Sequence, residues 1–187
     1  MFALFRANPV RDAAELAYSR IVAQARRPRF FTDGGVPDTL DGRFELICLH
    51  AFLYLHRLQR EVKAAAALGR HFCDAMFADF DRSLREMGTG DLSVGREVKR
   101  MARGFYGRVA AYESGLAGDD AVLQPALARN LFGTAPPAPA QLAAMARYVR
   151  REAAGLDRQD AAELLAGQPR FGCPPSIADP GAGAQQQ

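Results

Sequence analysis

The sequence predicts an all-α, single-domain protein, a bundle of about six or seven helices followed by a disordered carboxyl-terminal tail. Three observations lead to this prediction. Apolar residues recur at intervals of three and four over most of the chain, which is the spacing of one helix face. No stretch alternates apolar and polar residues over more than a few positions, as a strand does. At 187 residues the chain is long enough to bury one continuous core.

The composition suggests three segments: an amino-terminal arm at residues 1–10, a helical domain at 11–167 and a disordered tail at 168–187. The tail has no hydrophobic period and is rich in Pro, Gly and Gln. The net charge of +3 is far below that of a dedicated nucleic-acid binder. The three cysteines form no CxxC pair and the first residues lack the pattern of a secretory signal, so we expect a reduced, cytoplasmic protein.

The first two helices are predicted at Asp12–Arg27 and at about Thr39–Arg60. Pro28 ends the first, because a residue that precedes proline disfavours helical backbone. The second contains Leu46–His56, a run without charge that is about half the length needed to cross a bilayer. A helix this apolar must be enclosed on most sides, so we expect it at the centre of the bundle.

The third helix is predicted at Val62–Met87, with Gly88 as the residue that ends it. It carries an apolar seam at four-residue spacing: Leu68, Phe72, Met76, Phe80 and Leu84. Two ion pairs are expected on its exposed side: Asp81 with Arg85 and Arg82 with Glu86. The long seam indicates a helix packed along most of its length.

The remaining helices are predicted from Asp91 or Ser93 to Leu116, and over three shorter segments: Asp120–Leu131, Pro139–Ala154 and Arg158–Ala166. Gly104 and Gly107 lie inside the first of these, where each costs about 1 kcal/mol relative to alanine. We expect close packing of a neighbouring helix to offset that cost. The segment APPAP provides the hinge that precedes the helix at Pro139.

No pattern in the chain predicts catalysis, a metal or a cofactor. GDLSVGR resembles a phosphate-binding loop, but a helix precedes it and Glu97 stands where a hydroxyl would hold magnesium. His50 and His56 are six residues apart and point in different directions on a helix. No serine stands in a GxSxG turn and no ExxH pair is present. We therefore expect a protein that is not an enzyme.

The loop DGGVPDTLDGRFE precedes the most apolar helix. Its glycines permit a turn, and Asp38 is predicted as the helix N-cap with Asp41 at N3, where a carboxylate suits the helix dipole. Capping does not account for Gly42 in the first turn, nor for Arg43, which stands at the unfavourable end of the dipole.

Four blocks of the sequence resemble the ubiquinol cytochrome c chaperone family: SRIVAQAR at 19–26, GVPDTLDGRFE at 35–45, MFADFDRSLREMGTGDLSVG at 76–95 and FYGRVAAYE at 105–113. The resemblance extends from Tyr18 to about Leu131 and rests on long, ordered blocks. A lysine is frequent in this family where the chain has Arg96, and a methionine where it has Phe80; charge and apolar character are kept. The chain after Leu131 lies outside the resemblance.

The resemblance implies an assembly factor for respiratory complex III, the ubiquinol cytochrome c reductase. Mitochondrial relatives bind newly made cytochrome b and act with a second small chaperone near the ribosome exit. The implied role is that of a bacterial member, peripheral at the cytoplasmic face of the inner membrane, with cytochrome b as client. A holding chaperone needs a stable scaffold, exposed apolar surface and discriminating charges, and it needs no nucleophile.

On this basis we predict a set of partner-binding residues that combines charged and apolar side chains: Asp38, Arg43, Met76, Phe77, Glu86, Met87, Asp91 and Arg96. Two other functions remain open. The first is a helical enzyme or haem-binding protein with His50, His56 or His71 as ligand. The second is a membrane-surface adaptor that uses the amino terminus and a group of basic residues: Arg20, Arg26 and Arg27.

Overall fold

The computed structural model describes residues 8–133 and 135–177. Within these residues the chain forms eight α-helices and one short 3-10 helix, with no β-strand, which confirms the predicted fold class. In chain order the elements are α1 (Pro9–Ala25), α2 (Arg29–Thr32), α3 (Leu40–Leu58), η1 (Gln59–Glu61), α4 (Val62–Glu86), α5 (Asp91–Ala117), α6 (Asp120–Leu131), α7 (Pro139–Asp157) and α8 (Ala161–Leu165).

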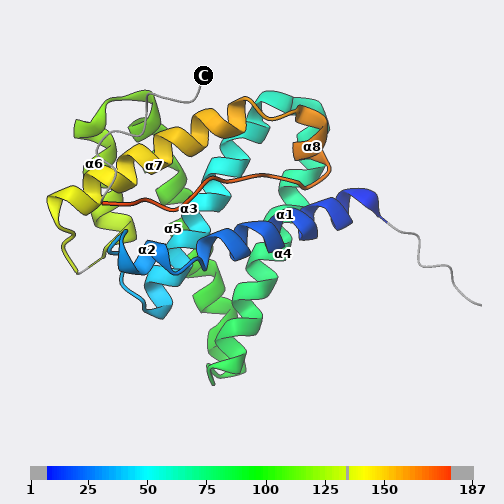
Figure 1. Cartoon of the computed structure of the whole chain (residues 1–187). Coiled ribbons are helices and arrows are strands. Elements are labelled where there is room, and N and C mark those ends of the chain that lie inside the picture. Colours follow the sequence, from blue (N-terminus) through cyan, green and yellow to red (C-terminus); the bar gives the residue numbers. More distant parts are fainter. Residues whose placement is uncertain (1–7, 134, 178–187) are drawn as a thin grey trace, which may run out of the picture.

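Helix α3 lies at the centre of the bundle, as predicted (Figure 1). Helices α1, α4, α5, α6 and α7 all contact it. Every residue from Leu46 to Tyr54 is buried, because this helix is apolar around its whole circumference. Its surroundings therefore form one continuous core rather than separate layers.

Helix α1 begins and ends earlier than predicted. The side chain of Asn8 accepts hydrogen bonds from the backbone N–H groups of Val10 and Arg11, and Pro9 occupies the first turn. Asparagine at the N-cap and proline at the next position are strong helix-start signals. Helix α2, which the sequence pattern did not predict, follows after Pro28 and places Phe30 in the core.

The N-cap of α3 is Thr39 and not Asp38, so that prediction was wrong. The Thr39 hydroxyl accepts a hydrogen bond from the backbone N–H of Gly42 at 3.1 Å. Gly42 itself is explained by a close approach, because a Cβ at this position would lie 2.0 Å from the carbonyl oxygen of Pro37. The loop and the helix start can therefore pack together only with glycine here.

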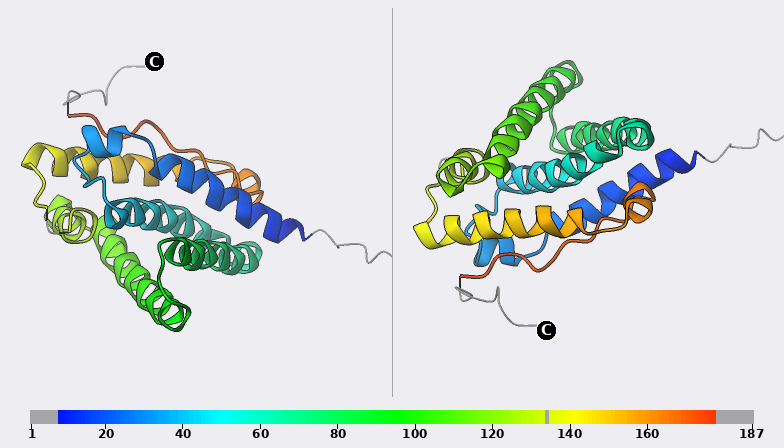
Figure 2. Two further views of the ribbon diagram at one scale, coloured as in Figure 1. Left: turned by 90° about the horizontal axis from the view of Figure 1, so that it is seen from below. Right: turned by 90° about the horizontal axis from the view of Figure 1, so that it is seen from above.

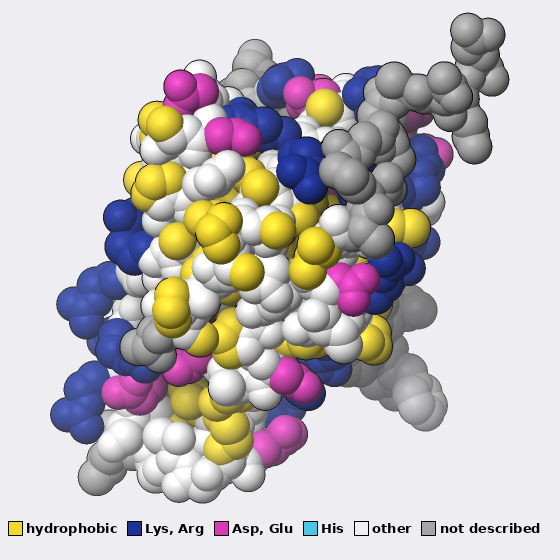
Figure 3. All heavy atoms as spheres, turned by 60° about the vertical axis from the view of Figure 1, so that its left-hand side comes forward, with side chains coloured by type: hydrophobic (Ala, Val, Ile, Leu, Met, Phe, Trp, Pro, Cys, Tyr) yellow, Lys and Arg dark blue, Asp and Glu magenta, His cyan; other side chains and the backbone are white. Residues whose placement is uncertain are grey.

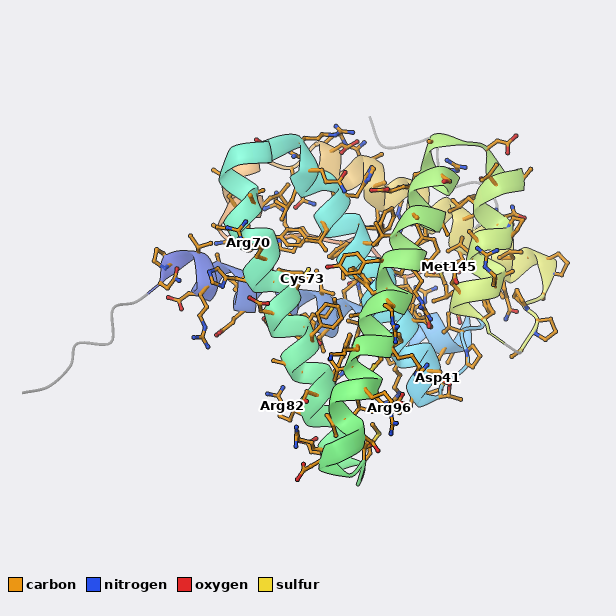
Figure 4. The ribbon with its side chains drawn as sticks, turned by 180° about the vertical axis from the view of Figure 1, so that it is seen from behind. Asp41, Arg70, Cys73, Arg82, Arg96 and Met145 are labelled. Atoms are coloured by element: carbon orange, nitrogen blue, oxygen red, sulfur yellow. The ribbon has the colours of Figure 1, made fainter. Side chains whose placement is uncertain are left out.

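Helices α4 and α5 form a long hairpin whose closed end projects from the bundle (Figures 1 and 2). Gly88, with φ of 85°, ends α4 as predicted. The expected close packing at Gly107 is absent: a Cβ there would meet nothing within 4 Å. The two helices diverge away from the closed end, so that the end of α3 and η1 lies between them (Figure 4).

The segment 168–177, expected to be part of a disordered tail, instead lies against α1 and α7. The carbonyl of Gly172 accepts a hydrogen bond from Gln24 Nε2 at 2.9 Å, and its N–H donates to Glu152 at 2.7 Å. Phe171 packs edge-on against His50. These backbone contacts are not visible in a sequence pattern that looks for helical periods. The remaining residues of the expected tail, 178–187, and most of the expected arm lie outside the described residues.

Candidate functional site

The predicted partner-binding residues fall in three separate places. Asp38 and Arg43 lie together in front of α3, where their side chains pair at 2.7 Å and each remains about half exposed (53% and 55%). The hydrogen bond from Arg43 lowers the pKa of Asp38. The Arg43 guanidinium also lies 5.8 Å from the ring centre of Phe31. Arg43, which capping does not explain, therefore has a local structural role beside the Asp38 loop.

The second group lies at the closed end of the α4–α5 hairpin. Met87 is 49% exposed, and the side chain of Asp91 pairs with Arg85. Arg85 also pairs with Asp81 at 2.6 Å, as predicted. Arg82, by contrast, pairs with Asp79 and not with Glu86, since a partner three residues earlier is within reach. The pairing expected for Glu86 was thus wrong, and its side chain is exposed.

Arg96 lies on α5 near the same closed end of the hairpin (Figure 4). Its guanidinium donates a hydrogen bond to the hydroxyl of Ser93 at 3.3 Å, and the side chain is exposed. Glu86, Met87, Asp91 and Arg96 therefore share one end of one hairpin.

The two remaining predicted residues, Met76 and Phe77, lie on different sides of α4. Met76 has no exposed surface and lies in the core with the predicted seam, so it presents nothing to a partner. Phe77, one residue further, is only partly buried and lines a groove. A step of one residue turns the side chain by about 100° around the helix, which explains the different surroundings.

The groove that Phe77 lines has a volume of about 660 Å³. It lies between the diverging helices α4 and α5, with the end of α3 and η1 as its floor. Its apolar lining consists of Leu55, Leu58, Ala65, Ala66, Gly69, Cys73, Phe77 and Tyr106, and its polar lining consists of Gln59, Arg70 and Asp74. In Figure 4, Cys73 faces the space between the two helices and Arg70 lies nearer the outer side of α4.

One wall of the groove is made of unusually small side chains on α4. A Cβ built on Gly69 would lie 3.8 Å from Leu55 Cδ2, which is ordinary contact, so a larger side chain there has room to extend. Burial raises the pKa of the Cys73 thiol to about 11, so this cysteine stays protonated at neutral pH and acts as a small apolar group. The wall therefore permits a close approach by another helix.

The opposite wall and the lower end of the groove are aromatic. Tyr106 is 60% exposed, the highest exposed fraction among the large hydrophobic side chains in the described residues. Below it, Phe77 and Phe105 pack edge to face with ring centres 6.3 Å apart and join α4 to α5. At the other end Gln59 donates a hydrogen bond to Glu113 at 3.1 Å. These contacts fix the spacing of the two walls.

A charged pair inside the bundle sets the position of α5. Glu45 of α3 accepts two hydrogen bonds from the Arg108 guanidinium, and both side chains are largely shielded from solvent. The same guanidinium lies 5.6 Å from the ring centre of Phe44, which packs on Phe80 of α4. Helices α3, α4 and α5 are thus tied together directly below the groove.

The groove residues apart from Phe77 were missed from the sequence. One signal was present: Gly69, Cys73 and Phe77 repeat at four-residue spacing beside the seam. The seam of larger apolar residues concealed this second stripe. Tyr106 gave no signal, because its exposure follows from how far α5 diverges from α4.

The structure gives His50, the first of the proposed haem ligands, another role. Its ring is fully buried, Nδ1 donates to the Leu46 carbonyl at 2.7 Å and Nε2 accepts from the Tyr148 hydroxyl at 2.7 Å. Both ring nitrogens are therefore occupied. In the described part of the chain, no cluster of three or more His, Cys, Asp or Glu side chains is arranged as a metal site. Nor is any helix described there long and apolar enough to span a bilayer.

The second alternative used Arg20, Arg26 and Arg27, all of which are exposed at or near the end of α1. Arg27 donates to the side chain of Gln24 and to the carbonyl of Gly172, each at 3.4 Å. This residue is thus connected to the segment that lies over α1 and α7.

Comparison with known proteins gives consistent results. A family model for the ubiquinol-cytochrome C chaperone matches residues 32–171. The crystal structure of the Cbp3 homolog from Brucella abortus is 38% identical, with a TM-score of 0.78, and the match covers 91% of this chain and 93% of that one.

Two relatives carry the name ubiquinol-cytochrome c reductase complex assembly factor 1. The Xenopus laevis protein is 29% identical over 156 residues, which are 83% of this chain and 78% of that protein. The human protein is 27% identical over 156 residues, which are 83% of this chain and 52% of that protein. The chain thus spans about half the length of the human and mouse relatives. These names describe assembly factors, in agreement with the expectation of a protein that is not an enzyme.

The family match extends beyond Leu131, where the resemblance in the sequence blocks ended, and reaches the segment that lies over α1 and α7. Because the family model covers well over half of the chain, the protein belongs to the ubiquinol-cytochrome C chaperone family.

Proposed function

We propose that this protein is an assembly factor for complex III that holds newly made cytochrome b until the subunit is incorporated. Family membership supports the first part, because relatives are named complex III assembly factors. The observation that carries the second part is the apolar groove between α3, α4 and α5. The protein acts through reversible contact and makes or breaks no covalent bond.

The shape and lining of the groove suit an apolar helix of a membrane protein. Such helices associate through close packing of small residues, since lipid tails are as apolar as their own side chains. Ala66, Gly69 and Cys73 provide a wall against which a helix backbone can lie closely, and Phe77 and Tyr106 provide larger apolar contacts. The groove therefore offers a temporary substitute for the neighbours that a membrane segment has in its finished complex.

Charged residues around the groove provide selectivity. Arg70 and Asp74 line it and are exposed, so a client segment meets both signs of charge at its edge. The exposed residues at the closed end of the hairpin, Glu86, Asp91 and Arg96, are proposed as further polar contacts. Polar groups in such positions steer association and disfavour wrong partners more than they add affinity.

The other predicted residues take different places in this proposal. Phe77 and the exposed Met87 are proposed as apolar contacts, and Met76 is omitted because it is buried. Asp38 and Arg43 lie outside the groove, beside α2, and are proposed for contact with a second assembly factor or the ribosome. We place the protein at the cytoplasmic face of the inner membrane, where its client is inserted.

Complementation of a gene deletion tests this function. We expect the deletion strain to lose the cytochrome b signal in reduced-minus-oxidised spectra of its membranes and in an immunoblot, and the wild-type gene to restore both. Gly69→Phe, which fills the groove, should fail to restore them. Ala23→Phe, at an exposed position on α1, is the matched control and should restore them.

The possible outcomes test the assembly function and the groove separately. Normal complex III in the deletion strain would remove the assembly function altogether. Full restoration by Gly69→Phe would remove the groove as the client site and leave the assembly function standing. Circular dichroism of both purified variants excludes misfolding as the cause of a loss.

A further inference from the structure

Helix α5 carries a row of basic residues on its outward face. Arg96, Lys99, Arg100 and Arg103 are all exposed, and their spacing of three or four residues places them on one side of the helix. Tyr106 continues the row by another turn and stands at the edge of the groove. From Arg96 to Tyr106 the row is about 15 Å long. In Figure 3, Lys and Arg side chains gather along one edge of the molecule and continue beside the projecting hairpin.

The positive charge of this row is largely uncompensated. Glu97 is the single carboxylate between residues 95 and 107, and it pairs with Arg100 at 2.7 Å. On α4, Asp81 pairs with Arg85, and so does Asp91 at the start of α5, so neither neutralises the row. Glu86, at the end of α4, is a further exposed carboxylate near the start of the row.

We propose that the row Arg96, Lys99, Arg100, Arg103 and Tyr106 binds the surface of an anionic phospholipid bilayer. Each basic side chain can reach a lipid phosphate, and a partly exposed tyrosine suits the boundary between head groups and acyl chains. Met87, exposed at the closed end of the hairpin, adds a second apolar contact on the same hairpin. A nucleic acid offers phosphates to the row but has no complement for the apolar groove beside it.

Bound in this way, the groove opens next to the bilayer, because Tyr106 belongs both to the row and to the groove. A client helix leaving the groove would then reach the hydrocarbon region without crossing bulk water. This surface rests on the proposed location at the inner membrane, but not on the identity of the client. The purified protein alone is therefore sufficient to test it.

The test is flotation of the full chain with two kinds of vesicle. One kind is phosphatidylcholine with phosphatidylglycerol added at 30%, a composition set by the experiment, and the other is pure phosphatidylcholine. We expect binding to the anionic vesicles only. The triple variant Arg96→Gln, Lys99→Gln and Arg103→Gln should bind about a hundredfold more weakly, since one cation near an anionic bilayer contributes roughly fivefold. Tyr106→Ser should weaken binding about equally at low and high salt.

The matched control removes the same number of exposed cations elsewhere: Arg20→Gln, Arg147→Gln and Arg158→Gln. It should retain the binding of the wild type. An equal loss of vesicle binding in both triple variants would show that the vesicles attract the net charge of the protein and not this row, and would overturn the proposal. Absence of wild-type binding to anionic vesicles would overturn it as well. Binding of an RNA oligonucleotide through the same three residues without vesicle binding would assign the row to nucleic acid and also overturn it. The vesicle assay uses the purified protein without a client, so its result does not depend on the result of the complementation test.

Discussion

Arg108 of α5 donates two hydrogen bonds to the carboxylate of Glu45 in α3, and this pair fixes one wall of the groove to the centre of the bundle. Glu45 is 7% exposed. Burial raises the pKa of Glu45, while the hydrogen bond from Arg108 and its positive charge act in the opposite direction. The arginine thus keeps a carboxylate charged at a place where water cannot.

Arg108→Met should therefore destabilise the protein by about 3 kcal/mol, because it leaves the Glu45 carboxylate shielded and unpaired. The loss should grow as the pH rises. Because the pKa of Glu45 is higher in the folded than in the unfolded state, the folded protein keeps the Glu45 proton to a higher pH. Stability is therefore highest below the unfolded pKa and declines as Glu45 ionises. Urea unfolding at pH 5 and pH 8 measures this.

The double variant Glu45→Gln with Arg108→Met is the control for that prediction. It should recover part of the lost stability, and its stability loss should not grow with pH, since no buried carboxylate remains to ionise. Equal stability of the single and double variants at pH 8 would show that lost packing of the arginine stem, and not the unpaired carboxylate, is the cause.

A second prediction concerns the buried His50. Burial lowers its pKa to about 4, from an ordinary value near 6.5. Between these values the unfolded chain binds a proton that the folded chain does not, so stability is complete above about pH 6.5 and falls as the pH drops towards 4. The loss amounts to about 3 kcal/mol. Urea unfolding from pH 7 to pH 4 should show it, and His50→Gln should flatten the curve.

His71→Gln is the matched control for the histidine, because His71 lies on α4 and is only partly buried. If the slope between pH 6.5 and pH 4 is the same in His50→Gln as in the wild type, other groups cause the acid sensitivity.

A third prediction compares two glycines at helical positions. Gly42→Ala should lower stability by about 2 kcal/mol or more, because its Cβ would overlap the Pro37 carbonyl and force the loop away from α3. Gly107→Ala meets open space and should raise stability by up to about 1 kcal/mol. Thermal unfolding followed by circular dichroism distinguishes the two. A stabilised Gly42→Ala variant would contradict the packing described for the loop.

A fourth prediction concerns the segment over α1 and α7. Glu152, 4% exposed, accepts the N–H of Gly172 at 2.7 Å. Glu152→Ala should release the segment and accelerate tryptic cleavage after Arg170 by about tenfold, the effect expected from losing a hydrogen bond to a charged group. Glu86→Ala, at an exposed position on the hairpin, should not change the rate. Unchanged cleavage in the Glu152 variant would show that other contacts hold the segment.

The fold followed from the sequence where local signals are strong. The uncharged run of α3 and the seam from Leu68 to Leu84 predicted a central helix and a long packed helix, and Gly88 marked the end of α4. Helix starts differed from the prediction where two residues could serve as the N-cap. Helix α1 begins at Pro9, after the N-cap Asn8, and Thr39 rather than Asp38 caps α3. The pattern of polar and apolar residues therefore locates the helices more accurately than it locates their ends.

The groove could not be predicted in the same way. It exists because α4 and α5 diverge, and the angle between two helices depends on side chains far apart in sequence, such as Glu45 and Arg108. Phe77 was predicted as a partner contact for its apolar character, and Met76 for the same reason. Only the packing of α4 shows that one faces the groove and the other faces the core.

The central claim is that the groove holds the client, and site-specific photocrosslinking tests it most directly. A benzophenone amino acid replaces Cys73 inside the groove, or Val122 on α6 as an exposed control, and cytochrome b is synthesised in the presence of each variant. Crosslinks to cytochrome b from position 73 and not from position 122 are the predicted result. Crosslinks from position 122 alone, or from neither position while the client still co-purifies, would contradict the account.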